Sequence, residues 1–191
     1  MCIAILQTKS ATALTFDEFE NSWKRNPDGA GMLFANAGKM VTIKELDCLE
    51  SFYDTYRYIF DGGHAEGALA IHFRYATHGL KNEANCHPFL VDNKLGFIHN
   101  GIIHSVKATA TKSDTRVFME EVLRKLPKGF YKDAEIMDAI TEHIGWSKLV
   151  FVDHNGDFAI NNKRSGHWRK GTWFSNSSYL GSMPSRERLT A

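Results

Sequence analysis

The sequence predicts an α+β fold in which antiparallel strand pairs pack in layers with helices. Two strand pairs are each joined by a short turn rich in Asn and Gly, at 36–38 and at 155–156. Strands and helices both tend to occur in pairs along the chain, whereas regular alternation of single strands and helices is typical of a doubly wound parallel sheet. We therefore expect packed α+β layers.

The first half of the chain contains two expected helices, both with an apolar stripe. Thr15 precedes Glu18 by three residues, which is the spacing of a capping box at a helix start. The second helix is expected to end at Gly62-Gly63. The expected elements are a buried strand at 2–7, a helix at 15–25, two strands within 30–46, a helix at 47–60 and a strand at 67–77.

The second half contains two further helices and the strongest hairpin signal. The third helix is expected to stop at Pro127, and the hairpin turns at Asn155-Gly156. The expected elements are a polar loop at 78–88, a strand pair at 89–101, helices at 113–126 and 133–144, a hairpin at 148–162, a solvated basic loop at 161–171 and a last strand within 171–180.

Composition indicates one globular domain. The 191 residues are 43% hydrophobic with a net charge of +1, so no global field points to nucleic acid or a membrane. We expect residues 1–180 to form the domain and 181–191 to form a loose tail. Three cysteines without CxxC spacing argue against a disulfide framework. Neither an export signal nor a membrane span is recognisable, so we expect a cytoplasmic protein.

Cys2 is the first candidate catalytic residue. It can be a small buried residue of the first strand, or it can be a nucleophile uncovered when Met1 is removed. In the second case its own free α-amine, with an ordinary pKa of about 7.7–8.0, is the built-in base for the thiol.

Three further motifs carry candidate chemistry, each with a structural alternative. Arg74 ends a strand, where its planar fork can bind a carboxylate or form an internal salt bridge. Asn100-Gly101 can be a tight turn, or a side-chain amide beside an accessible backbone N–H that stabilises an oxyanion. Asp114 can simply start a helix with Ser113 or hold a substrate ammonium.

Two rival functions rest on other residues. Nine histidines make a metal site conceivable, but their spacings match no ligand pattern and HExxH is absent, so no metal and no cofactor are expected. The basic stretch 161–171 could contact nucleic acid, although a solvated loop is the simpler interpretation.

The order of Met-Cys, RYATHG, NCHPF, HNGII and SDT resembles the glutaminase domain of class II glutamine amidotransferases, which are N-terminal-nucleophile hydrolases. The run 72–103 is especially similar to the glutaminase half of glucosamine-6-phosphate synthase. This resemblance implies a four-layer α/β/β/α sandwich. It also implies that L-glutamine is the substrate and that ammonia leaves from its side-chain amide.

The resemblance also implies a role for each motif. Cys2 would attack the amide carbon and form a γ-glutamyl thioester. Asn100 and the N–H of Gly101 would stabilise the oxyanion. The substrate-binding residues would be Arg74 for the α-carboxylate, Asp114 for the α-ammonium, and Thr77 and His78 as lining.

Two departures from the family pattern leave alternatives open. Ile3 stands where relatives commonly have glycine, and no synthase domain is recognisable. We therefore expect either a separate synthase subunit that takes up the ammonia, or action on glutamine or another γ-glutamyl or amide substrate alone. A catalytically idle binding or regulatory module is the remaining alternative.

Overall fold

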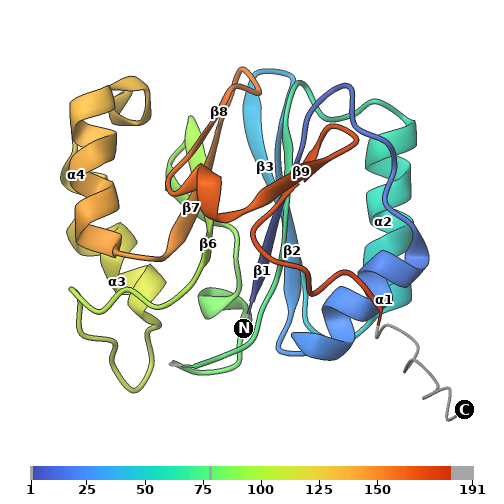
Figure 1. Cartoon of the computed structure of the whole chain (residues 1–191), viewed down its shortest axis with the longest axis horizontal. Helices are drawn as coiled ribbons and strands as arrows, with labels where there is room; N and C mark the ends of the chain where they lie inside the picture. Colours follow the sequence, from blue (N-terminus) through green and yellow to red (C-terminus); the bar gives the residue numbers. More distant parts are fainter. Residues whose placement is uncertain (1, 78, 182–191) are drawn as a thin grey trace, which may run out of the picture.

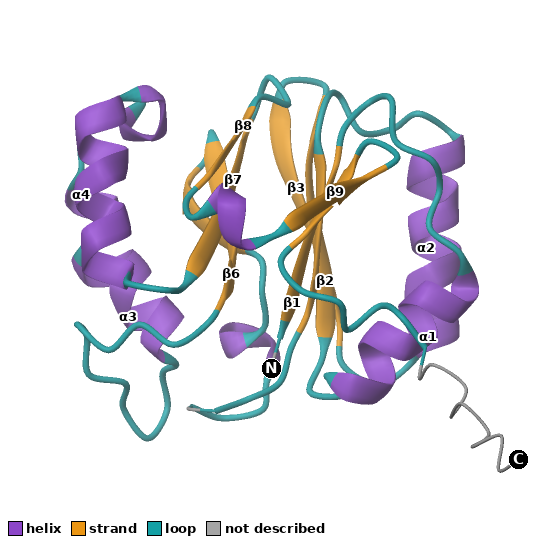
Figure 2. Cartoon of the chain, viewed as in Figure 1, coloured by secondary structure: helices purple, strands orange, loops and turns teal. Residues whose placement is uncertain are grey.

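A computed structural model describes residues 2–77 and 79–181, which form four layers (Figures 1 and 2). Helices α1 (Phe16–Arg25) and α2 (Leu49–Asp61) cover one sheet, while α3 (Asp114–Glu121) and α4 (Ala134–Ile144) cover a second sheet. The two sheets face each other, and every strand pairing in the described residues is antiparallel. The α/β/β/α sandwich is confirmed.

The first sheet brings both ends of the described chain together. Its strands are β1 (Ile3–Gln7), β2 (Ala30–Asn36), β3 (Lys39–Glu45), β4 (Leu69–Phe73), β9 (His167–Arg169) and β10 (Thr172–Phe174). They run in the order β3-β2-β4-β1-β10-β9. Because β1 lies between β4 and β10, Cys2 is held next to segments that are far from it in sequence.

The second sheet places Asn100 at the end of a buried strand. Its strands are β5 (Phe89–Asp92), β6 (Leu95–Asn100), β7 (Lys148–Asp153) and β8 (Phe158–Ile160), in the order β5-β6-β7-β8. The turn between β7 and β8 contains Asn155-Gly156, as predicted. Asn100 pairs directly with Lys148 across the β6–β7 ladder.

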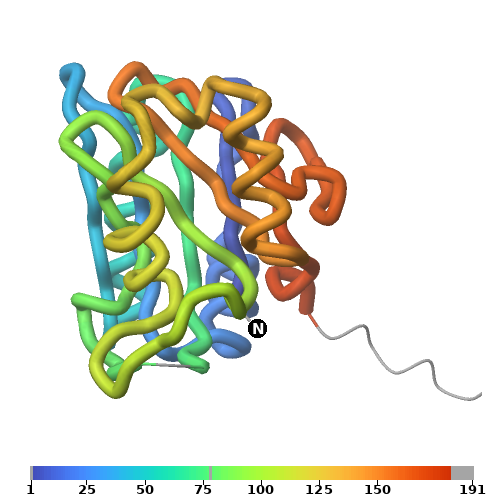
Figure 3. The backbone as a smooth tube through the Cα atoms, turned by 90° about the vertical axis from the view of Figure 1, so that its left-hand side faces the viewer, coloured from blue at the N-terminus to red at the C-terminus, as the bar shows by residue number. Residues whose placement is uncertain are grey.

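Three apolar clusters fill the spaces between the four structural layers. A strand contributes side chains to two of these clusters, because successive side chains point to opposite faces of its sheet. In β1, Ile3 and Ile5 pack toward α1 and α2, whereas Ala4 and Leu6 pack between the sheets. In β7, Phe151 packs toward the other helix layer while its neighbours meet the facing sheet. Figure 3 views the molecule with α3 and α4 in front of the sheets.

The helix ends follow from local chemistry. The Thr15 hydroxyl accepts a hydrogen bond from the backbone N–H of Glu18, and the Glu18 carboxylate accepts one from the N–H of Thr15, so the predicted capping box is confirmed. Ser113 and Asp133 are the N-caps of α3 and α4. Short 3-10 helices occupy Glu83–Asn85, Leu123–Lys125, Phe130–Lys132 and Lys163–Ser165.

Three sequence predictions were wrong in detail. The basic stretch 161–171 is not only a loop, because it contains β9, and positive φ angles at Lys170 and Gly171 turn the chain back into β10. The third helix ends at Glu121 and continues as a 3-10 turn instead of reaching 126. The last strand is only three residues long.

The proposed tail lies, apart from Gly181, outside the described residues. Within residues 2–77 and 79–181, no helix combines the length and the apolar character needed to cross a bilayer.

Candidate active site

The thiol of Cys2 sits at the open end of β1, half-buried beside the chain that leaves β4. The backbone N–H of Tyr75 donates to Cys2 Sγ at 3.1 Å, and the thiol lies 3.4 Å from the carbonyl oxygen of Tyr75. Burial raises the pKa of the thiol, although the Tyr75 contact and the charge of Arg74 oppose this rise. The backbone after β4 therefore fixes the position of the sulfur.

Two asparagines hold the carbonyl group of Cys2. Asn100 Nδ2 donates to the Cys2 carbonyl oxygen at 2.5 Å, and Asn176 Nδ2 donates to the same oxygen at 2.8 Å. Asn100 ends β6 and Asn176 follows β10, so the two sheets meet at this carbonyl group. Since an amide nitrogen has two hydrogens, Asn100 keeps a second donor for another acceptor.

Gly101 permits a close backbone approach beside Asn100. Its φ is +142°, which side chains rarely adopt, and a Cβ added here would lie 2.3 Å from Ser147 Oγ. Ser147 Oγ itself donates to the carbonyl oxygen of Ile102 at 3.0 Å. A glycine is therefore required where the chain leaves β6 against the start of β7.

A small cavity of about 20 Å³ joins residues that the sequence separates widely. It is lined by five of the predicted site residues, namely Cys2, Arg74, Thr77, Gly101 and Asp114. Its volume is about that of one water molecule. An amino acid can occupy this side of Cys2 only if the cavity widens.

Arg74 and Asp114 supply opposite charges to this small cavity. Arg74 is 3% exposed and donates from Nη1 to the carbonyl oxygen of Leu80 at 3.3 Å. Asp114 is 6% exposed at the N-terminus of α3, and its Oδ2 accepts from the N–H of Ile103 at 2.7 Å. The helix dipole stabilises a carboxylate there. A ligand with a carboxylate and an ammonium group matches this pair.

Asn85 connects the supports of Arg74 and Asp114. Its fully buried amide donates to the carbonyl oxygens of Leu80 and Thr111 and accepts from the N–H of Ser113, at 3.2, 2.8 and 3.0 Å. Leu80 also accepts from Arg74, and Ser113 caps the helix that begins with Asp114. One side chain therefore fixes both halves of the charged pair.

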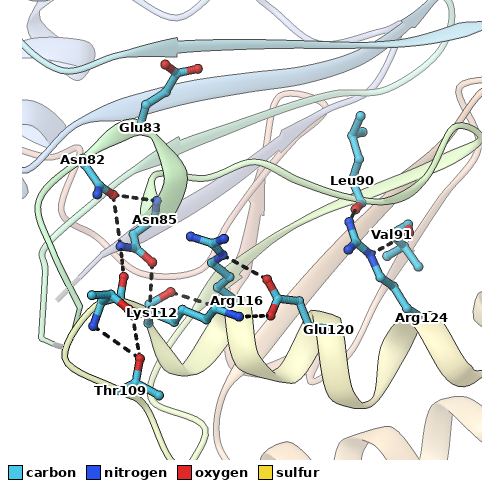
Figure 4. Close-up of polar contacts among 12 residues, drawn as sticks. Asn82, Glu83, Asn85, Leu90, Val91, Thr109, Lys112, Arg116, Glu120 and Arg124 are labelled. Carbon is cyan, nitrogen blue, oxygen red and sulfur yellow. Dashed lines mark hydrogen bonds and ion pairs between the residues drawn. The ribbon is translucent and has the colours of Figure 1, made fainter.

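Ion pairs fasten the neighbouring loop to α3 (Figure 4). Glu120 accepts from Lys112 Nζ at 2.6 Å and from Arg116 Nε at 3.0 Å. These contacts hold the pKa of Glu120 below its ordinary value. The loop before α3 is thus anchored by Glu120 on one side and by Asn85 on the other.

Three buried histidines lie at or beside the small cavity, and the sequence analysis considered the histidines only as a rival metal site. The ring centroids of His72 and His87 are 4.0 Å apart, and His87 and His99 are 6.1 Å apart. Desolvation lowers their pKa values, to about 3 for His72, to about 4 for His99 and well below the ordinary value for His87. The three rings are therefore neutral at pH 7.

Among residues 2–77 and 79–181, no group of three or more His, Cys, Asp or Glu side chains is placed to hold a metal ion. His72 Nε2 contacts the carbonyl oxygen of His99, and His99 Nδ1 contacts Thr115 Oγ1, each at 2.8 Å. One nitrogen of His72 and one of His99 are thus engaged, whereas the second nitrogen of each ring has no hydrogen-bond partner in the described structure.

A much larger chamber of about 530 Å³ is also lined by Cys2, and it shares Tyr75, Thr77 and Gly101 with the small cavity. Thr77, Asn100 and Gly101 line it together with the segment 142–148 and Asn176. Cys2 therefore lines both a narrow charged cavity and a wide chamber.

The structure thus brings together Cys2, Arg74, Thr77, Asn100, Gly101 and Asp114, whereas His78 lies outside the described residues. The sequence analysis missed Asn85, His87 and Asn176. His87 stood within the NCHPF motif, which was the available signal, and both of its buried ring nitrogens have no hydrogen-bond partner in the described structure. Asn176 lies in a Ser- and Asn-rich stretch that reads as an ordinary loop.

Comparisons with known proteins agree with the motifs. No family model matches the chain. A glutamine–fructose-6-phosphate aminotransferase (isomerizing) of Pseudomonas aeruginosa is 28% identical over 181 residues, which are 87% of this chain and 29% of that protein. The enzyme of the same name from Mesorhizobium japonicum is 37% identical over 76 residues, 34% of this chain and 12% of that protein. The chain thus spans less than a third of these relatives.

A solved structure supports the fold. Glutamine phosphoribosylpyrophosphate amidotransferase of Bacillus subtilis, in complex with ADP and GMP, superposes with a TM-score of 0.55 at 17% identity, covering 91% of this chain and 41% of that one. The four layers, the ordered motifs and the similar sequences agree. The chain is therefore similar in sequence to glutamine amidotransferases over most of its length, and its α/β/β/α fold matches that of a solved amidotransferase.

Proposed function

We propose that this chain is a class II amidotransferase-type amide hydrolase that releases ammonia from the side chain of L-glutamine. One observation carries the proposal: Cys2 lines one cavity together with Arg74 and Asp114, and a second, adjoining one together with Asn100 and Gly101. Nucleophile, amino-acid clamp and oxyanion donors are the three parts that such a reaction requires.

The nucleophile in this proposal is Cys2 after removal of Met1. Its free α-amine accepts the thiol proton, and Sγ attacks the δ-carbon of the glutamine side chain. The carbonyl oxygen gains negative charge, which Asn100 Nδ2 and the Gly101 N–H stabilise. The C–N bond then breaks, the nitrogen takes up the proton and leaves as ammonia, and water hydrolyses the γ-glutamyl thioester to glutamate and free thiol.

The clamp gives selectivity for a free amino acid. The guanidinium of Arg74 would pair with the α-carboxylate in bidentate fashion, and Asp114 would pair with the α-ammonium. Thr77 would line the same space, and we assign His78 to it by motif alone. Burial of both charges strengthens these contacts relative to water.

We further propose that the ammonia passes to a separate synthase subunit. The names of the relatives join glutamine to a second substrate, as in glutamine–fructose-6-phosphate aminotransferase. Stimulation of glutamate release by a co-purifying synthase would support this step, and unchanged turnover in its presence would contradict it.

The test is glutamate release from L-glutamine by the purified chain, after intact-mass measurement has shown loss of Met1. We expect turnover by the parent chain and its loss in Cys2→Ala, with an unchanged melting temperature. Retention of turnover in Cys2→Ala would refute the thiol mechanism. Glutamine binding by calorimetry without turnover would favour an idle binding module instead.

A further inference from the structure

The 530 Å³ chamber beside Cys2 is far larger than release of ammonia requires. A water molecule, which is similar in size to ammonia, takes a share of about 30 Å³ in the liquid. If Arg74 and Asp114 hold the amino-acid end of a γ-glutamyl group in the small cavity, the group on the amide nitrogen has the adjoining chamber, which Cys2 also lines, to extend into. The chamber then receives whatever the nitrogen carries.

Lys148 gives this chamber a positive charge. It is the cross-strand partner of Asn100, and opposite residues in a sheet point to the same face. Its side chain is half-buried, and desolvation lowers its pKa. Within residues 2–77 and 79–181 it forms no ion pair, not even with Glu142, which also lines the chamber. A half-buried lysine in a cavity is suited to an anionic ligand.

The same chamber has an apolar wall. Trp146 is 90% exposed at the turn between α4 and β7, and Ile102 and Ile144 line the chamber with it. A large aromatic side chain that remains this exposed gains most from covering an apolar ligand group. Lys148 lies only two residues beyond Trp146, so charge and apolar surface meet on one wall.

We propose that this chamber binds the leaving half of a γ-glutamyl amino acid, with the α-carboxylate of that half at Lys148 and its apolar side chain against Trp146. The inference rests on the proposed function of Cys2 and extends its substrates from glutamine to γ-glutamyl dipeptides such as γ-glutamyl-leucine.

The chemistry balances without a further reactant. Sγ of Cys2 attacks the γ-carbonyl carbon, and the C–N bond to the second amino acid breaks. Its nitrogen takes the proton that came from the thiol and leaves as a neutral α-amine. Water then hydrolyses the γ-glutamyl thioester, which yields glutamate and restores the thiol.

The experiment compares three substrates with the mass-verified chain: L-glutamine, γ-glutamyl-leucine and γ-glutamyl-leucinamide, which lacks the carboxylate. We expect hydrolysis of γ-glutamyl-leucine with a kcat/KM at least equal to that of glutamine. Lys148→Met should lower kcat/KM for γ-glutamyl-leucine about tenfold more than for the amide, and Lys148→Arg should restore most of the loss. Lys94→Met, in the β5–β6 turn, is the matched control.

Trp146→Ala should lower kcat/KM for γ-glutamyl-leucine about tenfold relative to γ-glutamyl-glycine, with Tyr58→Ala on the exposed face of α2 as control. Turnover of glutamine without turnover of γ-glutamyl-leucine would overturn this inference and leave the proposed function standing. Turnover of neither substrate would overturn both. If Lys148→Met lowered kcat/KM equally for γ-glutamyl-leucine and γ-glutamyl-leucinamide, Lys148 would not bind the carboxylate, and the assignment would be refuted.

Discussion

Asn100 and Asn176 donate hydrogen bonds to one and the same atom, the carbonyl oxygen of Cys2. Asn100 comes from the end of one sheet and Asn176 from the loop that leaves the other. Because the carbonyl group precedes β1 directly, this shared contact sets the orientation of the residue that bears the thiol. The two asparagines differ in their surroundings, since Asn100 is followed by Gly101, whose N–H is the second expected oxyanion donor, and Asn176 is not.

The two asparagines should respond differently to removal. Asn100→Ala should lower kcat for glutamate release by about 10²–10³, because it removes an oxyanion donor together with the carbonyl contact. Asn176→Ala removes one hydrogen bond to Cys2, worth about 0.5–1.5 kcal/mol, besides a local one from the Ser178 N–H, and should lower kcat about three- to tenfold. Steady-state kinetics check this order. Equal losses in both variants would contradict the assignment of the oxyanion role to Asn100.

Replacement of Arg74 by lysine should damage substrate binding although the charge is kept. The lysine ammonium cannot form the two parallel bonds of a guanidinium, and it loses the reach to Leu80. We expect KM for glutamine to rise about tenfold or more while kcat changes less. An unchanged KM in Arg74→Lys would show that the α-carboxylate binds elsewhere.

Asn85 should be important for stability as well as for binding. Asn85→Ala strips partners from the buried Ser113 N–H and Thr111 carbonyl, so we expect the free energy of unfolding to fall by about 2–3 kcal/mol. Urea unfolding measures this loss. Asn82→Ala is the comparison, because it removes the cap of the short 3-10 turn and one contact with the Asn85 amide but leaves the contacts of Asn85 with Ser113 and Thr111 in place; it should cost less, about 1 kcal/mol. A small effect in Asn85→Ala would mean that water replaces these contacts.

The buried histidines predict a loss of stability on acidification. Their pKa values in the folded chain, about 3 for His72 and about 4 for His99, lie below the ordinary 6.5. The unfolded chain therefore binds more protons below pH 6.5, and the free energy of unfolding should fall from there toward pH 4. Each histidine contributes up to about 1.4 kcal/mol per pH unit.

Urea unfolding at intervals between pH 7.5 and 5 measures this slope. The carboxylates with lowered pKa values, such as Asp28 and Asp153, titrate below this pH range and therefore do not contribute to the slope. His72→Gln should reduce the slope by the amount that corresponds to the uptake of about one proton on unfolding. A flat stability profile from pH 7.5 to 5 would show that the three rings are already protonated or accessible to solvent.

The sequence predicted most elements because local chemistry determines them. The capping box at Thr15 and the Asn155-Gly156 turn depend on residues a few positions apart, and both are confirmed. β9 was missed because three residues, two of them exposed, carry no periodic signal. Its pairing with β10 depends on the turn at Lys170-Gly171 and on the strand beyond it.

The candidate site shows the same division. Cys2, Arg74, Asn100 and Asp114 were found because motifs in a known order mark them. Asn176 and Lys148 act through contacts across the fold, and an asparagine or lysine of this kind has no local signature. No pattern in the sequence distinguishes a half-buried lysine beside Asn100 from one on an exposed strand end.

The pairing of β1 with β10 has a consequence for the order of synthesis. The residue that bears the thiol leaves the ribosome among the first, but its carbonyl contact with Asn176 spans 174 positions of the chain. A nascent chain that lacks β10 leaves one edge of β1 unpaired, and Asn176 is not yet in place to hold the carbonyl group of Cys2. Cys2 therefore gains its full set of contacts only after nearly the whole described chain has been made.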